Sequence, residues 1–417
     1  MPENYTIDMP EAVRNIIHTI EEHGFKAYAV GGCIRDSILG RNPDDWDITT
    51  SAVPSQIKTF FKRTIDTGIV HGTVTVMVNK TGYEVTTYRI DGEYEDGRHP
   101  KSVEFSDRLV DDLCRRDFTI NAMAYNDTDG FVDEFKGLDD LDAKIIRCVG
   151  EPELRFTEDA LRMMRAIRFS AQLGFTIDEA TWNAIKKLSP SISKISMERV
   201  HVELGKTLMS AHPDYVAEYS EAGLFAPILP VIDNALKSRY KRKILATLQH
   251  TPDNIYLRYA ALFITSTPDE AAKTLRALKL DNKTVDTVSK LVELSKMDIE
   301  ETEPAVRTAL NKYGRDFLPL WHELMMAVIQ ASEDITGISN PAKVKHLLTL
   351  KRLGTDILAR GDCFTIKDLD ISGNDLIEYG LQGHEIGETL KSLLDIVIEN
   401  PKLNDKTTLI AMIEHIK

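Results

Sequence analysis

The sequence predicts an α+β region, with a mixed sheet and flanking helices, followed by an all-α remainder. Runs of β-branched residues bounded by turn signals occur only before about residue 148. From Glu151 onward, apolar residues recur with the period of helices. A chain of 417 residues is also long enough for more than one domain. We therefore expect an α+β head and separate helical domains after it.

The composition argues against a membrane protein and for the cytoplasm. Hydrophobic residues make up 42% of the chain, and no apolar run reaches the roughly 18 residues of a membrane span. The N-terminal stretch MPENYTIDMPEAV is polar and acidic, unlike a signal peptide. The cysteines are scattered without a C-x-x-C pair, which argues against a zinc site or a disulfide framework and for a reducing compartment. They are Cys33, Cys114, Cys148 and Cys363.

The net charge of −14 argues against a nucleic-acid binder, because such proteins usually carry a basic footprint. The field that a ligand meets is local, however. Basic clusters stand at Arg115-Arg116, along residues 162–168, and at Lys237–Lys243. Together they permit a basic groove, although each alone is also typical of a solvated helix face.

The first elements of the head follow from periodicity and turn residues. Apolar residues at helical spacing, such as Val13, Ile16, Ile17 and Ile20, predict helices. β-Branched runs on both sides of the turn 79–82 predict a hairpin. The expected elements are helices 10–24 and 57–63 and strands 27–30, 45–48, 72–78 and 83–89.

The second half of the head combines an irregular loop with a polar motif. Residues 90–104 are charged, aperiodic and contain glycine, which predicts a mobile and functional loop. Residues 113–124 predict a helical stretch bearing Arg116 and Asp117. The arginine suits a phosphate and the aspartate a sugar hydroxyl, and an intrahelical ion pair is the alternative. Short strands are expected at 131–132 and 145–146.

Two adjacent glycines, Gly31 and Gly32, separate the apolar run 27–30 from a short amphipathic segment that ends at Leu39. Glycine lets the backbone approach a ligand closely and turn its N–H groups outward. The start of a helix also favours anions. The glycine pair therefore suits a phosphate, although two glycines alone are a weak signal.

Asp45 and Asp47 stand at the start of an expected strand. Side chains two apart share a strand face, so the two carboxylates project together while Trp46 points into the core. Such a pair suits a hard divalent cation, and Mg²⁺ fits best. Glu84 is either a third carboxylate or an outward polar residue. A lone D-x-D is common on surface turns, but its position after the strand, the glycine pair and the helix predicts phosphoryl or nucleotidyl transfer.

A helix is expected from Thr157 to Phe169, with Thr157 as its N-cap. Glu158, Arg162 and Arg165 fall on one face, with Asp159 beside them, while the opposite face is apolar and predicts core. The polar face is either a set of intrahelical salt bridges or a binding surface. The apolar face is formed by Ala160, Met163, Met164 and Ile167.

Asp159 and Arg162 together would select particular nucleotide bases. A carboxylate only accepts hydrogen bonds, and a guanidinium only donates them. Cytosine and adenine offer an exocyclic amine beside a ring-nitrogen acceptor, whereas guanine and uracil offer a carbonyl beside a ring N–H. The pair therefore accepts C and A and rejects G and U, because the wrong base leaves charged groups unmatched.

The motifs GGCIRD…DDWD, DLCRRDFTINAMA and RFTEDALRMMRAIRF, in this order, resemble those of the class II tRNA nucleotidyltransferases, the CCA-adding enzymes of the polymerase-β nucleotidyltransferase superfamily. The resemblance is specific over residues 27 to about 205 and weaker beyond. It implies a nucleotidyltransferase head followed by an all-α neck, body and tail. The implied domains are 1–148 (catalytic head), 149–205 (neck, base recognition), 206–330 (body) and 331–417 (tail, tRNA binding).

The resemblance also implies residue roles. Asp45 and Asp47 would hold Mg²⁺ as the catalytic carboxylates. Gly32 and Arg35 would contact the triphosphate, Arg116 would lie near phosphate, and Asp117 near the ribose. Asp159 and Arg162 would read the base edge, supported by Arg165 and Arg168. The tRNA 3′-hydroxyl would attack the α-phosphate of CTP or ATP and release pyrophosphate. Positioning of the reactants and neutralisation of charge would account for the acceleration of the reaction.

Three comparisons within the family narrow the expected activity. Residues 257–266 lack the His-Asp signature of relatives that carry a phosphohydrolase domain, so no hydrolase activity is expected. Residues 66–73 replace the basic glycine-arginine stretch of bacterial poly(A) polymerases. The loop Asp91–Pro100, which CC-adding members lack in part, favours full CCA addition. An A-adding enzyme, a poly(A) polymerase and a non-catalytic RNA-binding module remain the alternatives.

Overall fold

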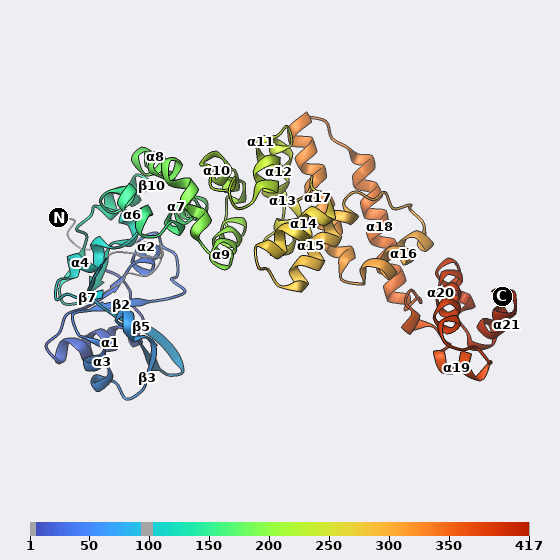
Figure 1. The fold of residues 1–417 in the computed structure, drawn as a ribbon, viewed down its shortest axis with the longest axis horizontal. Helices are drawn as coiled ribbons and strands as arrows, with labels where there is room; N and C mark the ends of the chain where they lie inside the picture. The colour runs from blue at the N-terminus through green and yellow to red at the C-terminus, as the bar shows by residue number, and fades with distance from the viewer. Residues whose placement is uncertain (1–5, 93–102, 417) are drawn as a thin grey trace. The chain divides into compact units, whose positions relative to one another are not determined.

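The computed structural model describes residues 6–92 and 103–416. The chain divides into two compact units, residues 1–230 and 231–417 (Figure 1). The first unit holds the sheet and the helices that follow it in sequence, and the second consists of helices among its described residues. This composition confirms the prediction of a mixed-sheet head followed by helical segments.

A seven-stranded mixed sheet forms the framework of the first unit, in the order β3-β4-β5-β2-β1-β8-β9. All neighbouring strands are antiparallel except β2 and β5, which run parallel. The strand β3 was not expected from the sequence. The bounds are β1 (Ala27–Val30), β2 (Asp47–Thr50), β3 (Thr64–Gly68), β4 (Thr73–Val78), β5 (Thr81–Thr87), β8 (Ala124–Asn126) and β9 (Gly130–Val132).

The first helices and the hairpin confirm the periodicity argument, with shifted ends. The helix α1 (Glu11–Glu22) buries Val13, Ile16, Ile17 and Ile20 as expected. The helix α3 (Pro54–Phe60) begins three residues earlier than predicted, because Pro54 suits its first turn. The turn between β4 and β5 is tighter than predicted, since Asn79 and Lys80 both adopt positive φ and close a two-residue hairpin loop.

The predicted loop 90–104 is only partly a loop. Its ends form a small antiparallel sheet from β6 (Arg89–Asp91) and β7 (Val103–Phe105), which the aperiodic sequence did not indicate. The rest of that prediction, including most of Asp91–Pro100, falls on residues 93–102 and lies outside the described residues.

The predicted helical stretch 113–124 is wrong. The helix α4 (Leu109–Cys114) ends before the two arginines, and only a short 3₁₀ turn, η2 (Thr119–Asn121), follows. Asp117 explains the interruption, because its side chain accepts the N–H of Phe118 at 2.9 Å, and such local bonds compete with helix. Arg116 and Asp117 therefore stand on an irregular segment, where their side chains can point in different directions.

The single helix expected from Thr157 is instead two helices, α6 (Pro152–Glu158) and α7 (Leu161–Leu173). Thr157 is not an N-cap, since it lies inside α6 and its hydroxyl donates to the carbonyl of Glu153. The helix is interrupted at Asp159, whose side chain accepts a hydrogen bond from the N–H of Leu161 at 3.0 Å. The apolar face of α7 is core as predicted, because Met163, Met164 and Ile167 have no exposed surface.

Helices make up nearly all of the described chain after α7. One two-residue strand, β11 (Thr176–Ile177), pairs with β10 (Ile145–Ile146), so strands do not vanish completely after residue 151. No helix within the described ranges combines the length and apolar character needed to cross a bilayer. The remaining α-helices are α2 (Gly32–Ile38), α5 (Gly137–Asp142), α8 (Glu179–Leu188), α9 (Met197–Leu208), α10 (Val216–Glu221), α11 (Pro230–Lys237), α12 (Lys241–His250), α13 (Ile255–Leu262), α14 (Pro268–Ala277), α15 (Asn282–Leu294), α16 (Glu303–Tyr313), α17 (Phe317–Thr336), α18 (Pro341–Arg360), α19 (Gly373–Glu378), α20 (His384–Glu399) and α21 (Lys406–Ile416).

Candidate active site

Two carboxylates stand side by side where β2 begins. Asp47 is the first residue of β2, and Asp45 precedes it by two positions. Both aspartates are exposed, whereas Trp46 between them is 9% exposed and packs inward, as the alternation of a strand requires. The parallel register that joins Ile48 to Val85 places Glu84 of β5 opposite Asp47. The sheet therefore brings a third carboxylate next to the pair.

These acids share one electrostatic environment. Burial by the surrounding protein raises the pKa of Asp47, the nearby Asp45 raises it further, and Arg116 opposes both effects. Burial also raises the pKa of Glu84, followed by the charges of Asp47 and Asp45. The described part of the chain nevertheless contains no group of three Asp, Glu, His or Cys side chains placed to hold a metal ion. Glu84 is thus a neighbour of the pair, and its role as a third carboxylate stays a prediction.

A cavity of about 190 Å³ opens beside Asp47 and Glu84. Its walls come from β1, β2, β4, β5 and β6 and from the segment that follows α4. Acidic and basic side chains both line this site cavity, which suits a ligand that carries anionic groups and a cation. The lining residues are Val30, Asp47, Ile48, Thr73, Glu84, Thr86, Arg89, Arg115 and Arg116.

The glycine pair lies against an arginine of this site cavity. Gly31 follows β1 with a φ of 87°, a backbone conformation that residues other than glycine rarely adopt. A Cβ at this position would lie only 2.9 Å from Nη1 of Arg116. Gly32 begins α2, and a Cβ there would lie 3.7 Å from Nη2 of Arg35. Gly31 therefore admits the close approach of Arg116, whereas Arg35 lies at an ordinary contact distance from Gly32.

Arg35 and Arg165 meet around an aromatic ring that the sequence analysis did not single out. The guanidinium carbons of Arg35, Arg165 and Arg168 lie 5.1, 5.3 and 3.9 Å from the ring centroid of Phe169. Such distances allow cation–π attraction. Arg35 is nearly buried and also donates to Asp36 and, at 2.7 Å, to Asn121. Phe169 therefore joins α2 of the head to the arginines of α7.

Asp117 is the link between the head and α7. Its carboxylate pairs with Arg165 at 2.6 Å and accepts a bond from Asn121. Burial would raise the pKa of this carboxyl, but Arg165 and Asn121 outweigh burial and lower it to about 2. Asp117 is therefore ionised throughout the physiological range. The intrahelical ion pair considered as an alternative is not its arrangement, because the partner arginine stands 48 residues away.

Asp159 and Arg162 have separate partners. Arg199 of α9 grips the Asp159 carboxylate, with Nη2–Oδ2 at 2.6 Å and Nη1–Oδ1 at 3.2 Å. Arg162 pairs with Glu158 at 2.5 Å and donates to the backbone carbonyl of Arg115 at 2.9 Å. Sequence reasoning assigned no role to Arg199, which stands in the stretch SMERVHVEL. Position along the chain gave no signal that it meets Asp159.

Arg168 plays a structural part beside these residues. It pairs with Glu203 of α9 at 2.7 Å, and both side chains are buried. Burial lowers the pKa of Arg168, while the charge of Glu203 raises it. This buried pair joins α7 to α9, the two helices that carry Arg162 and Arg199. The supporting role that the resemblance implies for Arg168 stays a prediction.

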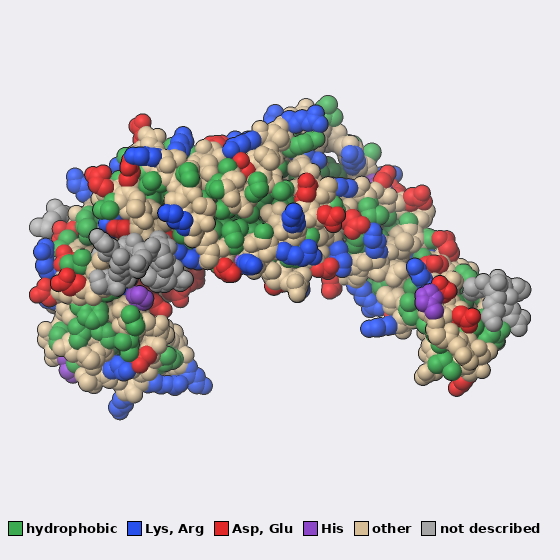
Figure 2. Space-filling model, in the orientation of Figure 1, with side chains coloured by type: hydrophobic (Ala, Val, Ile, Leu, Met, Phe, Trp, Pro, Cys, Tyr) green, Lys and Arg blue, Asp and Glu red, His purple; other side chains and the backbone are tan. Residues whose placement is uncertain are grey.

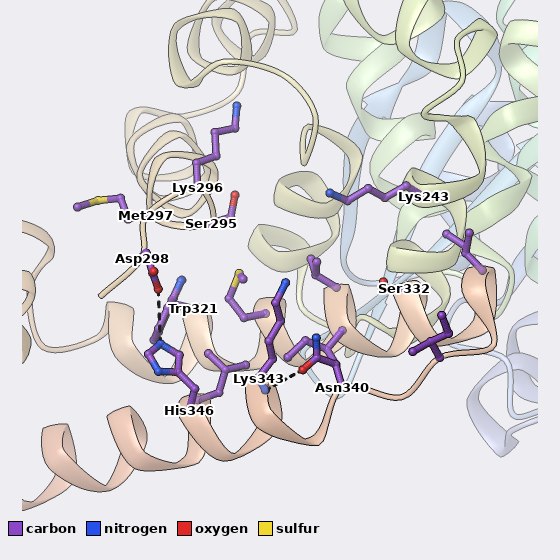
Figure 3. Close-up of a pocket in the computed structure, with 16 residues that line it drawn as sticks. Lys243, Ser295, Lys296, Met297, Asp298, Trp321, Ser332, Asn340, Lys343 and His346 are labelled. Atoms are coloured by element: carbon purple, nitrogen blue, oxygen red, sulfur yellow. Dashed lines mark hydrogen bonds and ion pairs between the residues drawn. The ribbon is translucent and has the colours of Figure 1, made fainter. Parts of the chain in front are cut away.

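A second cavity, of about 580 Å³, lies in the second unit between α12, α15, α17 and α18. Figure 3 shows Lys243 and Lys343 extending toward it from different helices, and Asp298 contacting His346. Its deeper lining is apolar, with Trp321, Met325 and Ile329 among its residues. Its lining holds one carboxylate, Asp298, whereas Asp47 and Glu84 both line the site cavity. The basic run 237–243 contributes only Lys243 to this cavity, and Lys237 pairs with Asp233 instead.

Cationic and anionic side chains alternate over the face shown in Figure 2, so the local basic clusters do not merge into one basic patch on that face. All four cysteines are free, as their scattered positions predicted.

Family models match three segments of the chain. Residues 27–147 match a poly A polymerase head domain, residues 174–236 a probable RNA- and SrmB-binding site of polymerase A, and residues 256–413 a tRNA nucleotidyltransferase domain 2. The first segment contains the site cavity, and the second contains Arg199. The matches therefore cover the head and much of the helical remainder.

Curated proteins and a solved structure resemble the chain as well. It is 34% identical to the CCA-adding enzyme of Pediococcus pentosaceus, over 98% of each chain. The match to the CCA-adding enzyme of Limosilactobacillus reuteri (strain DSM 20016) is 48% identical but spans only 54% of this chain and 56% of that protein. The crystal structure of the Bacillus stearothermophilus CCA-adding enzyme in complex with CTP matches with a TM-score of 0.75 and 32% identity, over 97% of this chain and 96% of that one.

Proposed function

The chain belongs to the family of CCA-adding enzymes, and on that premise we propose that it adds CCA to the 3′ end of tRNA without a nucleic-acid template. CTP and ATP are the substrates, and pyrophosphate is the product. The observation that carries the proposal is the meeting of Asp47 and Arg116 in one cavity. Carboxylates suit a cation and guanidinium suits phosphate, so this cavity provides for both parts of a metal-bound triphosphate.

The paired carboxylates fit a divalent metal, which nucleotidyltransferases of this kind generally use. Asp45 and Asp47 share a strand face, and the charge of Asp45 raises the cost of ionising Asp47. A cation at this position would remove that cost. We propose Mg²⁺, because it needs few protein carboxylates and takes further ligands from substrate phosphates. When bound, such an ion neutralises charge on the phosphates and orients them for in-line displacement.

Separate residues of the chain would hold the phosphates, the ribose and the base of the nucleotide. Arg116, with the backbone at Gly32, would bind phosphate groups, and Arg35 supports this region through its contact with Asn121. Asp117 would accept a bond from a ribose hydroxyl while Arg165 fixes its orientation. The tRNA 3′-hydroxyl then displaces pyrophosphate from the α-phosphate. No side chain becomes covalently attached, so positioning and charge carry the rate.

Asp159 and Arg162 would read the base, as the donor and acceptor argument predicts. The structure adds a constraint that supports this proposal: Arg199 and the N–H of Leu161 hold the Asp159 carboxylate in one orientation. A rigid acceptor discriminates better than a mobile one, because a wrong base cannot recruit it by a rotamer change. Arg165 and Arg168 would support the arrangement from the same helix.

The four-domain division and the location are also proposals. Head, neck, body and tail at 1–148, 149–205, 206–330 and 331–417 follow the family pattern, in which the helical parts hold tRNA by shape and backbone. The cytoplasm is proposed from the free and scattered cysteines. A poly(A) polymerase or an A-adding enzyme is less favoured, because the relatives described above carry the CCA-adding name.

The test is an extension assay with Mg²⁺ and tRNA that lacks its 3′ CCA. CTP alone, ATP alone, both, and all four nucleotides are offered, and product lengths are read on a sequencing gel. Two added residues with CTP and three with both would support the proposal. A long ladder with ATP alone would indicate a poly(A) polymerase. A single A added only to tRNA ending in CC would indicate an A-adding enzyme, and no extension a binding module.

A further inference from the structure

Asp112 is a fully buried carboxylate next to the site cavity, and sequence reasoning gave it no role. It lies on α4 with an exposed fraction of 0%. A buried charge is costly unless it is paired and hydrogen-bonded. Burial alone would raise the pKa of Asp112, but Arg115 and Arg116 outweigh burial and lower it. The side chain therefore carries a negative charge at neutral pH.

Its hydrogen-bond partners all belong to the site cavity or to the strand that carries the paired carboxylates. Oδ1 accepts bonds from Arg115, with Nε at 2.9 Å and Nη2 at 2.6 Å. Oδ2 accepts bonds from Nη2 of Arg116 at 3.3 Å and from Oγ1 of Thr49 at 3.1 Å. Thr49 is two residues beyond Asp47 on β2 and shares its face of the strand. One carboxylate thus joins the phosphate-binding arginines to the metal-binding strand.

This arrangement prevents a competition between charges. Arg116 and Asp47 line the same cavity, so the guanidinium lies where it can attract that carboxylate. Without a competing anion, the guanidinium would gain from moving onto Asp47 and would then occupy the place of a cation. Asp112 supplies a competing anion, because its Oδ2 accepts a bond from Nη2 of Arg116 at 3.3 Å. It is also fully buried, so water weakens its attraction for the guanidinium very little.

We propose that Asp112 is a positioning residue that holds Arg115 and Arg116 at the wall of the site cavity, apart from Asp45 and Asp47. Its bond with Thr49 keeps this anchor in register with the strand. The cation and the triphosphate consequently meet separate partners, and neither has to displace an internal ion pair. This inference rests on the proposed function, because it assigns the cation to the paired aspartates.

The test uses Mn²⁺ as the metal probe and the full-length protein. Asp112→Asn keeps the shape of the side chain but removes its charge. Free Mn²⁺ is measured by electron paramagnetic resonance without nucleotide, and CTP binding is measured by calorimetry in EDTA. We expect both dissociation constants to rise about tenfold, because each charged hydrogen bond of this kind is worth about one factor of ten or more.

Asp140→Asn is the matched control. Asp140 is also a buried carboxylate of the head and accepts bonds from Thr119 and Arg147, but neither partner lines the site cavity. We expect this variant to lose stability like Asp112→Asn while both dissociation constants stay within about twofold of the parent. Equal weakening in both variants would overturn the proposal, because a general disturbance of the head would then explain it.

A double variant separates positioning from structure. If Asp112 acts by restraining Arg116, then Arg116→Gln should return the Mn²⁺ affinity of the Asp112→Asn protein to within about threefold of the parent. Failure to recover would overturn the proposal. If Asp112→Asn does not fold, Thr49→Val replaces it. We then expect a smaller loss of both affinities, and unchanged affinities would contradict the proposal.

The same data distinguish this inference from the proposed function. Suppose that the parent protein extends tRNA and binds Mn²⁺, and that Asp112→Asn binds Mn²⁺ and CTP as tightly as the parent does. This result would overturn only the positioning role. A parent that binds no Mn²⁺ would remove the metal assignment and the positioning role together.

Discussion

The guanidinium of Arg199 holds the carboxylate of Asp159 through two contacts, Nη2–Oδ2 at 2.6 Å and Nη1–Oδ1 at 3.2 Å. The two residues stand 40 positions apart and come from α9 and the break between α6 and α7. A carboxylate fixed in this way presents its remaining acceptor positions in a constant direction. Base selection is therefore expected to depend on Arg199 as well as on Asp159 and Arg162, the two residues proposed to read the base.

Asp159→Ala and Arg162→Ala should each relax the choice among the four nucleotides. Each removes a charged contact that the proposed function assigns to the base edge, so discrimination should fall by about 1.5–3 kcal/mol. The ratio of kcat/KM for CTP to that for UTP measures this loss. Arg147→Ala is a suitable control, because Arg147 pairs with Asp140 and Asp178 instead. Unchanged rejection of GTP and UTP would refute the pairing argument.

Arg199→Gln should relax base choice more than it slows CTP addition. The variant keeps a hydrogen-bond donor for Asp159 but loses the second contact and the charge, so the acceptor becomes mobile without being lost. We expect UTP misincorporation to rise about tenfold while kcat with CTP stays within about threefold. Single-nucleotide extension rates with each triphosphate provide the measurement. If CTP and UTP rates fall together, Arg199 is needed for folding and not for selection.

The Asp45→Asn/Asp47→Asn variant should lose extension activity by at least about a hundredfold, as expected when charge stabilisation is removed from a transition state. Asp44→Asn, an exposed neighbour of the pair, is the matched control and should remain active. Product length on a sequencing gel reports both. Retained activity in the double variant would show that the metal assignment is wrong.

Asp47→Asn alone should stabilise the metal-free protein. The pKa of Asp47 is raised in the folded state, so the folded protein binds the proton more tightly than the unfolded chain does. Ionisation at neutral pH therefore lowers the free energy of unfolding. This loss develops as the pH rises above the pKa of the aspartate in the unfolded chain, about 4. Thermal unfolding in EDTA should show a higher Tm for the variant at pH 7.5 and no difference near pH 3. A lower Tm at pH 7.5 would contradict this sign.

Asp117→Asn should have the opposite effect on stability. The pKa of Asp117 falls from 3.8 to about 2 on folding, so its charge stabilises the native state above pH 4, and this contribution disappears as the pH falls through 2. The loss at pH 7 should be about 2 kcal/mol. Urea unfolding at pH 7 and at pH 2.5 tests the window, with the exposed Asp142→Asn as control. An equal loss at both pH values would exclude the ionic explanation.

Local patterns predicted the elements whose residues face one environment along their whole length. The apolar faces of α1 and α7 and the hairpin of β4 and β5 follow directly from side-chain periodicity. The helices predicted around Arg116 and Asp159 were wrong. At both places a side-chain oxygen accepts a hydrogen bond from a nearby backbone N–H, and this bond interrupts the helix. Periodicity does not register such a bond, since the residues on both sides remain compatible with helix.

The sequence by itself determined the chemistry of the site: two carboxylates on one strand face, a glycine pair before a short helix, and arginines in number. The tertiary structure decided which charge meets which. Thr49 and Asp112 stand 63 positions apart, Asp117 and Arg165 stand 48 apart, and Asp159 and Arg199 stand 40 apart. Ion pairs form wherever the packing of helices and sheet leaves opposite charges together out of water, and that packing depends on the whole buried core rather than on any local run of residues.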